Sequence, residues 1–500
     1  MLAATAQRLS ARDAARWRPS WRRIGWPWTV VGLAGTTLVA VVAPAIVGGS
    51  AGWWWSVRVP PGTTGNRVAL YVGVAAVAVA WLAVGRSARL PATRPVDLVA
   101  LALFWSLPLV VAPPLFSQDV YSYLAQGAIL HAGLDPYRVA PDVLAHLGGA
   151  RLAAAVSPFW RTTISPYGPS FVGAMSLVSV AARSSLELGV VLARLVELAG
   201  LLLAGIAVPA IARTAGGDPT RAVWLGVASP LVLFELVGAG HNDALMVGLM
   251  ALGVAAALRH HPLVAVGIGA LAASVKAPAA VAVVFVVVCS MKSASGWPAR
   301  LRVLAESAAV ACAAVAAVVA AAGLGTAWIS SSVLSAPAQV HLAITPVSEL
   351  AWIGRAILGA VGPAVSLHSV VVPVGDALFA LGGLVALVLV GRARLDTMVV
   401  AAGVSLLVVA FLGPAAWPWY FTWGLVLVAG SPSFQRSRVL VAALIVGVVL
   451  VKPDGILVFP FGAAPYVLGA YVVGGLAAWR VHRRRGQGRA AGDLGAAELA

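Results

Sequence analysis

An acid with polar and aromatic neighbours lies directly after an apolar segment near residue 115. In FSQDVYSYLAQGAILHAGLDPY, Gln118 and Asp119 precede Tyr121, Tyr123 and Gln126 on a predicted short helix. A carboxylate at the mouth of a membrane span can stay ionised while partly desolvated, which suits a general base. The alternative is that Asp119 only caps the helix.

The segment 116–166 carries further acids, bases and rings. Asp135-Pro136-Tyr137-Arg138 places an acid and a base in one turn, and SPYGPS at 165–170 predicts a rigid closing turn around Tyr167. Connectors between spans are usually much shorter, and long ordered loops more often carry function. We therefore expect this loop to hold the active site.

A second polar cluster is Gly240-His241-Asn242-Asp243, between two apolar runs. It could be only a tight turn. His and Asp beside a membrane-embedded turn would equally suit a sugar or phosphate site. Glu235 in the preceding run strengthens the second interpretation, because an intramembrane acid is costly and usually functional.

Lys276, in ASVKAPAA, is a cation between two apolar runs. It could snorkel to the interface or neutralise a lipid phosphate. Arg138 and Arg161 are two further cations that could share the phosphate role. His341 and Glu349 are candidates for acceptor contact, although a hydrated loop would explain them equally well.

The elements that position these residues are predicted to be membrane helices. Of the 500 residues, 61% are hydrophobic and 10% charged, and the mean hydropathy is +0.94, too apolar for a soluble domain. Apolar runs of about 20 residues recur without period-2 alternation, which indicates helices and not outer-membrane strands. We predict an all-α membrane protein, a multispanning helical bundle in the plasma membrane.

Basic residues predict the orientation of this bundle. The net charge of +17 is concentrated in short breaks and at both ends, which indicates topology rather than nucleic-acid binding. Breaks predicted to be cytoplasmic are 86–94, 213–221, 259–261, 292–302, 392–396, 436–438 and 480–485. Breaks predicted to lie outside are 49–67, 116–166, 240–243, the turn near Lys276, 324–345, 414–418 and 452–465. Outer aromatic belts are predicted at Trp53 to Trp55 and at Trp417, Trp419 and Tyr420.

Two short apolar segments, 168–182 and 346–362, conflict with this alternation if they span the membrane. We interpret both as interfacial or re-entrant helices, which leaves roughly 14 spans and both termini inside. The predicted organisation is a cytoplasmic basic tail at 1–27, a membrane domain at 28–480 and a second cytoplasmic tail at 481–500.

No Walker loop, Rossmann glycine fingerprint or HExxH motif is present, which argues against a nucleotide-dependent enzyme. No cluster predicts a metal, and no cofactor is expected. An energy-rich donor would have to come from the membrane.

The motifs FSQDVYSYLAQGAILHAGLDPY, SPYGPS and GHNDALMVGLMALG resemble those of the GT-C glycosyltransferases. More closely, they resemble the actinobacterial polyprenyl-phosphate-mannose-dependent α-1,6-mannosyltransferases of lipomannan biosynthesis. The resemblance covers most of 90–290 by motif and the remainder by hydropathy alone.

This resemblance implies a polyprenyl-phosphate mannose donor, a lipid-linked mannoside acceptor, inversion, and elongation of the lipomannan or lipoarabinomannan backbone outside the plasma membrane. It implies Asp119 as the base. The expected donor and phosphate contacts are Lys276, Arg138, Arg161 and His241. The expected sugar and acceptor contacts are Gln118, Tyr123, Asp135, Tyr137, Tyr167, Asn242, Asp243 and His341.

The main alternative is a transporter or flippase of a lipid-linked glycan. Transporters usually place their polar residues near the middle of the membrane between repeated halves, whereas these cluster on one predicted face. A scaffold without catalytic activity is the third possibility.

Overall fold

The computed structural model describes residues 24–47, 53, 63–87, 93–329, 345–362, 365–413, 415–453, 455 and parts of 466–476. Regular structure within these residues is helical, which confirms the predicted all-α membrane protein. His341, Trp54, Trp55, residues 1–23 of the first predicted tail and the whole of the second tail lie outside the described residues, and α3 begins at Trp26, within the predicted first tail.

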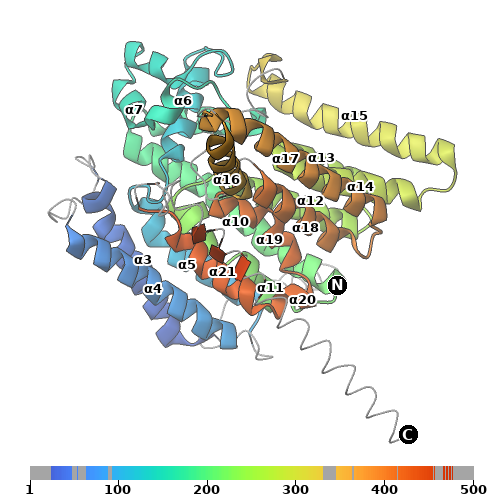
Figure 1. The fold of residues 1–500 in the computed structure, drawn as a ribbon, viewed down its shortest axis with the longest axis horizontal. Helices are drawn as coiled ribbons and strands as arrows, with labels where there is room; N and C mark the ends of the chain where they lie inside the picture. The colour runs from blue at the N-terminus through green and yellow to red at the C-terminus, as the bar shows by residue number, and fades with distance from the viewer. Residues whose placement is uncertain are drawn as a thin grey trace, which may run out of the picture.

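The helices pack into one bundle, with α10 and α12 near its centre (Figure 1). The first half of the chain contains α3 (Trp26–Val47), α4 (Thr64–Ser87), α5 (Pro95–Val111), α6 (Asp119–His131), η1 (Pro141–His146), α7 (Ala150–Ala155), α8 (Pro158–Arg161), α9 (Pro169–Ala182), α10 (Leu186–Thr214), α11 (Pro219–Gly226), the π-helix η2 (Val232–Gly238) and α12 (Asp243–Leu258). The second half contains α13 (Pro262–Ala273), η3 (Ala277–Ala279), α14 (Ala280–Ser293), α15 (Trp297–Ala321), η4 (Ala327–Ile329), α16 (Pro346–Val361), α17 (Leu367–Arg392), α18 (Met398–Leu412), η6 (Pro418–Phe421), α19 (Thr422–Val428), α20 (Pro432–Gln435) and α21 (Arg438–Val449).

Five of these helices are long and apolar enough to cross a membrane: α3, α4, α10, α15 and α17. The pair η2 and α12 would make a sixth span, but it is bent by 114° at the break between them. Other apolar helices in the described residues have only 10–17 residues. Hydropathy therefore located apolar helices, but the predicted count of roughly 14 spans is not established.

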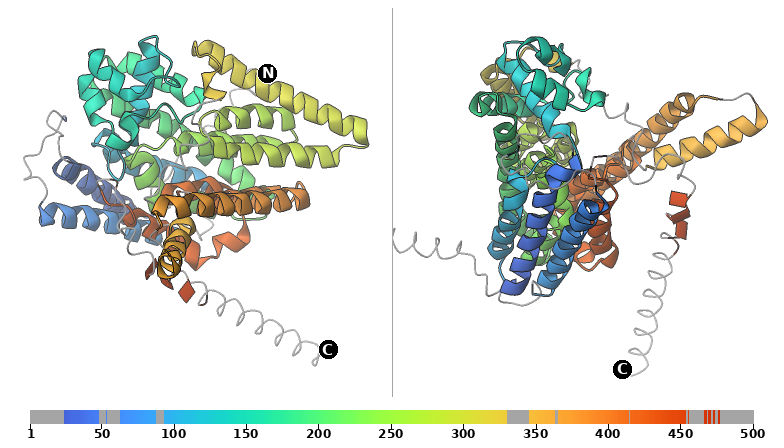
Figure 2. Two further views of the ribbon diagram at one scale, coloured as in Figure 1. Left: turned by 45° about the horizontal axis from the view of Figure 1, so that its top comes forward. Right: turned by 90° about the vertical axis from the view of Figure 1, so that its left-hand side faces the viewer.

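The two segments that conflicted with the charge pattern are α9 and α16, of 14 and 16 residues. α16 and the adjoining part of α17 extend away from the other helices, as the right-hand view of Figure 2 shows. They share a small apolar cluster of their own, which includes Val347, Ala351 and Val370.

α10 and α12 approach each other closely enough for their backbones to touch. A Cβ on Gly248 would overlap the Gly200 carbonyl, and a Cβ on Gly200 would overlap the backbone at Ala244. Small residues at such a seam let membrane helices pack closely. The seam fixes the start of α12, and with it the 240–243 turn, against α10.

The buried guanidinium of Arg194, on α10, joins two breaks in the bundle. It donates to the carbonyls of Val110, Ala112 and Pro113 at the end of α5, and to that of Gly238 at the end of η2. Carbonyls at helix ends have no intrahelical partner, and leaving them unpaired in an apolar interior is costly. Arg194 therefore holds together the segments that precede the two polar motifs.

Replacing Arg194 with Met should destabilise the protein by on the order of 3 kcal/mol, because several buried carbonyls lose their donor. The measurement is the thermal unfolding midpoint of the purified protein in detergent. Arg213→Met, at the exposed end of the same helix, is the control. Equal midpoints for the two variants would show that the Arg194 hydrogen bonds do not stabilise the fold.

Glu349 is buried in the first turn of α16, next to a capped helix start. Thr345 Oγ1 accepts a hydrogen bond from the Ser348 amide at 3.0 Å. Glu349 is 3% exposed, and its Oε2 has no hydrogen-bond partner in the described part of the chain. This environment contradicts the interpretation of Glu349 as a residue of a hydrated loop. Burial raises the pKa of Glu349 to about 7.

A raised carboxyl pKa makes stability fall as pH increases. The folded state binds the proton more tightly than the unfolded state, whose pKa is near 4.5, so this contribution is lost between about pH 4.5 and about pH 7. Glu349→Gln removes this loss and should stabilise the protein at pH 8 by up to about 3 kcal/mol, and much less at pH 5. Unfolding midpoints at the two pH values test this, and an equal effect at both would contradict it.

Candidate active site

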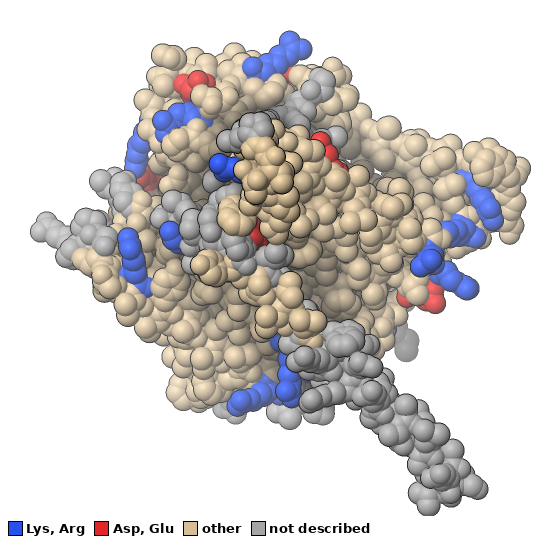
Figure 3. Space-filling model, in the orientation of Figure 1, with Lys and Arg blue, Asp and Glu red and all other residues tan. Residues whose placement is uncertain are grey.

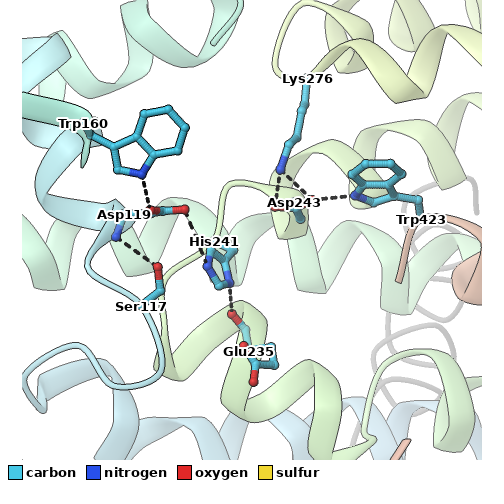
Figure 4. A network of polar contacts seen from close by, with 8 residues as sticks. All are labelled: Ser117, Asp119, Trp160, Glu235, His241, Asp243, Lys276 and Trp423. Carbon is cyan, nitrogen blue, oxygen red and sulfur yellow. Dashed lines mark hydrogen bonds and ion pairs between the residues drawn. The ribbon is translucent and has the colours of Figure 1, made fainter. Parts of the chain in front are cut away.

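Asp119 is the first residue of α6, and its side chain points away from the helix end. The N-cap is Gln118, and the Asp119 amide donates to Ser117 Oγ at 3.0 Å. The Asp119 carboxylate accepts a hydrogen bond from Trp160 Nε1 at 3.0 Å through Oδ1, and Oδ2 lies 3.8 Å from His241 Nε2 (Figure 4). The alternative that Asp119 only caps its helix is therefore wrong.

His241 reaches Asp119 from the break between η2 and α12. Gly240 has φ +75°, a conformation that glycine adopts without strain. His241 Nδ1 lies 2.6 Å from the backbone oxygen of Glu235. A carbonyl oxygen can only accept, so Nδ1 carries a proton and Nε2 faces Asp119. The imidazole also stacks on Trp419, with ring centroids 4.0 Å apart.

Buried Asp243 and partly exposed Lys276 form an ion pair on the other side of this turn (Figure 4). Lys276 Nζ lies 2.8 and 3.0 Å from the two carboxylate oxygens of Asp243. Trp423 Nε1 also donates to Asp243, and the ammonium lies 4.6 Å from the centroid of the Tyr420 ring. Lys276 thus binds a carboxylate, which contradicts simple snorkelling to the interface.

The chain segment 417–423 forms an aromatic wall along both acids. Trp417 stacks on Trp419, which covers His241, while Tyr420 and Trp423 stack beside Lys276. We predicted an aromatic belt here from the sequence, but Trp419 is only 5% exposed and belongs to the site. Trp53 is buried too and donates to the Val111 carbonyl at 2.7 Å. Sequence reasoning also missed Trp160, which no motif signals.

The predicted tyrosines form a packed layer next to Asp119. Tyr123 meets Tyr167 and Phe171 edge to face, with centroids 4.8 and 4.9 Å apart. The Tyr137 hydroxyl donates to the Tyr167 carbonyl at 2.9 Å. Burial raises the pKa of the Tyr123 and Tyr167 phenols far above the ordinary value, so both stay neutral. These residues support the loop, and their contact with a sugar stays a prediction.

The two predicted phosphate-binding arginines of the 116–166 loop contact other groups of the same loop. Arg138 is 75% exposed and pairs with Asp135 at 3.5 Å. Arg161 donates to the carbonyls of Ala154 and Val156 at 3.2 and 3.0 Å. Across the described residues, no hydrogen bond or ion pair joins either arginine to Asp119, His241 or Asp243. Gln118 is partly exposed beside Asp119.

Buried polar side chains without a hydrogen-bond partner in the described residues include two in the segment from η2 to the start of α12. They are the amide of Asn242, at both its nitrogen and its oxygen, and the carboxyl of Glu235. Both residues are 0% exposed. The turn therefore offers hydrogen-bonding capacity that the described protein does not use.

Comparison with known proteins identifies the family. Residues 28–292 match a model described as "Alpha-(1->6)-mannopyranosyltransferase, N-terminal domain", and residues 344–483 match the "MptB C-terminal domain". No solved structure matches.

Curated relatives carry the same family name. The chain is 32% identical over 410 residues to α-(1→6)-mannopyranosyltransferase A of Mycobacterium tuberculosis, covering 78% of this chain and 76% of the relative. It is 32% identical over 442 residues to α-(1→6)-mannopyranosyltransferase Rv1459c of the same organism, covering 75% and 73%. It is 35% identical over 242 residues to α-(1→6)-mannopyranosyltransferase A of Corynebacterium glutamicum, covering 46% of this chain and 48% of the relative. The chain therefore belongs to the α-(1→6)-mannopyranosyltransferase family and is a membrane glycosyltransferase.

Proposed function

We propose that the protein transfers mannose from polyprenyl-phosphate mannose to the 6-hydroxyl of a lipid-linked mannoside, elongating the mannan of lipomannan precursors. The names of its relatives support mannosyl transfer and an α-(1→6) linkage. The observation that carries the proposal is the Asp119 carboxylate, which is held at one oxygen by Trp160, faces His241 with the other, and is 21% exposed. Membership of this family removes the main support for the transporter and scaffold alternatives.

In this proposal the reaction takes place on the outer membrane face. The membrane domain at 28–480 has roughly 14 spans, and the basic tails at 1–27 and 481–500 both lie inside. The charge pattern supports this orientation, because arginine-bearing breaks predicted to be cytoplasmic meet at the far end of α10 from Asp119. The short helices η1, α7 and α8 then belong to the outer loop 116–166.

In the proposed step, the acceptor hydroxyl gives its proton to Asp119 Oδ2 as its oxygen forms a bond to the anomeric carbon. The bond between that carbon and the phosphate oxygen breaks, and the lipid phosphate leaves with the electron pair. Attack from the face opposite the phosphate converts a β-linked donor into an α-linked product. Phosphate is a good leaving group, so no strong general acid is needed. The Trp160 N–H holds Oδ1 in place, which orients Oδ2.

His241 Nε2 and Asp119 Oδ2 are 3.8 Å apart, too far for a hydrogen bond. With Nδ1 protonated, a neutral His241 offers an acceptor at Nε2, so two acceptors face the same gap. Groups that donate protons fit between two acceptors, which favours a sugar hydroxyl there over a phosphate oxygen. His241 thus binds and orients the acceptor, and the unpartnered Asn242 amide can receive further hydroxyls.

The donor phosphate lies beside Lys276 in this proposal. An ammonium has three N–H donors, and Asp243 accepts two of them. The remaining donor can stabilise the charge on the departing phosphate, where aromatic rings exclude water. Gln118, Tyr123 and Tyr167 border the acceptor side. Arg138, Arg161, Asp135 and Tyr137 would act only if the loop moves.

Asp119→Asn should lower kcat by about 10²–10⁴-fold, because the amide cannot accept the hydroxyl proton. The assay measures mannose transfer from labelled polyprenyl-phosphate mannose to a short α-1,6-mannoside. Asp142→Asn, an exposed acid on η1 of the same loop, is the matched control and should keep its activity. Undiminished transfer by the Asp119→Asn variant would end the role of Asp119 as base.

His241→Phe keeps an aromatic ring against Trp419 but removes Nε2. We expect the KM for the acceptor to rise about tenfold, as for one lost hydrogen bond, while the KM for the donor stays unchanged. His131→Phe, at the exposed end of α6, is the control. A rise in donor KM alone would instead assign His241 to the phosphate.

A further inference from the structure

Three arginine-bearing breaks that are distant in sequence meet at one end of the bundle. Arg86 ends α4, Arg221 lies on α11, and Arg436 and Arg438 flank the junction of α20 and α21. Together they line a cleft of about 710 Å³. A second cavity of about 260 Å³ shares Arg221 and Arg436 with it.

This cleft lies at the opposite end of α10 from the active site. Near its start, α10 contacts the segment before Asp119 through Arg194, and just beyond its end Gly217 packs against Gly430. At about 1.5 Å per residue, the stretch from 194 to 214 spans roughly 30 Å, the thickness of the hydrocarbon core. Figure 3 shows basic side chains at the lower edge of the molecule, where Figure 1 labels α11 and α20.

Gln435 lines the second cavity, and its hydrogen bonds fix the segments that carry the two shared arginines, Arg221 and Arg436. Gln435 is 4% exposed, donates to the carbonyls of Asp218 and Ala429 at 2.9 Å, and accepts from the Asp218 amide at 3.0 Å. Arg221 Nε donates to the Gln435 carbonyl at 2.7 Å. These bonds fix α11 against α20, so the arginines they carry converge in a defined arrangement.

The charge of the cleft is strongly positive. Its lining residues include four arginines and no acid, a formal charge of +4, and the adjoining cavity adds one acid, Asp218. Asp218 is itself occupied as the N-cap of α11, where its carboxylate accepts from the Arg221 amide at 2.7 Å. A preference for cytoplasmic arginine explains the sign of these charges but not their convergence on one cavity.

One wall of the same cleft is apolar. Trp224 lines the cleft, with its N–H donated to the Trp81 carbonyl at 2.9 Å, its ring stacked on Trp81, and the Arg221 guanidinium 5.6 Å from its centroid. Leu82 of α4 and Val441 of α21 line the cleft beside it, and Leu82 is 40% exposed. A cationic end next to an apolar wall matches an amphiphile with a phosphate head.

We propose that this cleft binds an anionic membrane phospholipid, with its phosphate against Arg221, Arg436 and Arg438 and its acyl chain along α4 and α21. Guanidinium groups match phosphate oxygens in geometry and charge. Basic pockets between membrane helices on the cytoplasmic side take such head groups. The site is separate from the transfer reaction and does not depend on the role of Asp119.

The test uses the full-length protein in detergent, titrated with phosphatidylglycerol or phosphatidylcholine, with bound lipid counted by native mass spectrometry. Phosphatidylglycerol should bind the wild type more tightly. Arg436→Gln with Arg438→Gln should weaken its binding by about 30-fold, and Arg86→Gln alone by about fivefold. The matched control is Arg392→Gln with Arg394→Gln, two exposed arginines with the same spacing at the end of α17.

Equal binding by the cleft and control variants would overturn the proposal, as would equal binding of the two lipids by the wild type. Displacement of phosphatidylglycerol by inorganic phosphate at equal concentration would overturn it too, by assigning the cleft to free phosphate. Asp119→Asn should leave lipid binding unchanged, so failure here is distinct from failure of the proposed transferase mechanism.

Discussion

The site depends on stabilising the helix ends that lie inside the apolar bundle. Where α5 and η2 end, their carbonyls have no intrahelical partner, and no water of a bilayer core could replace one. The Arg194 guanidinium supplies donors to both ends at once. Because of this contact, the chain can turn out of both helices at one place, and Asp119 and His241 follow shortly after those turns.

The two turns bring acids into surroundings that differ in an important way. Asp119 keeps a partly exposed oxygen beside a histidine with a fixed tautomer, which leaves it able to accept a proton. Asp243 is fully buried and paired with Lys276, so its role is to position the Lys276 ammonium. Two carboxylates on neighbouring segments therefore take different roles because their partners differ.

Much of this arrangement could be predicted from the sequence, because hydropathy and charge report which segments are apolar and which breaks carry arginine. Those signals located α3, α10 and the 240–243 turn, and the polar motifs identified Asp119, His241, Asp243 and Lys276 as neighbours. The π-helical form of residues 232–238 was missed, since a π-helix and an α-helix of the same residues have the same hydropathy. The roles of Trp160 and Trp419 were missed because the partner of an indole is set by tertiary packing. Arg138 and Arg161 were predicted to bind phosphate from their charge, yet the loop uses both in contacts of its own.

The glycine seam between α10 and α12 has a consequence for helix register. Gly200 and Gly248 interlock backbone to backbone, so neither helix can slide past the other without a collision. A slip of α12 by one residue would rotate its side chains by about 100° around the helix axis. Asp243 would then face away from Lys276, and the preceding turn would carry His241 out of line with Asp119. Two residues without side chains thereby determine the angular alignment of the charged groups in the site.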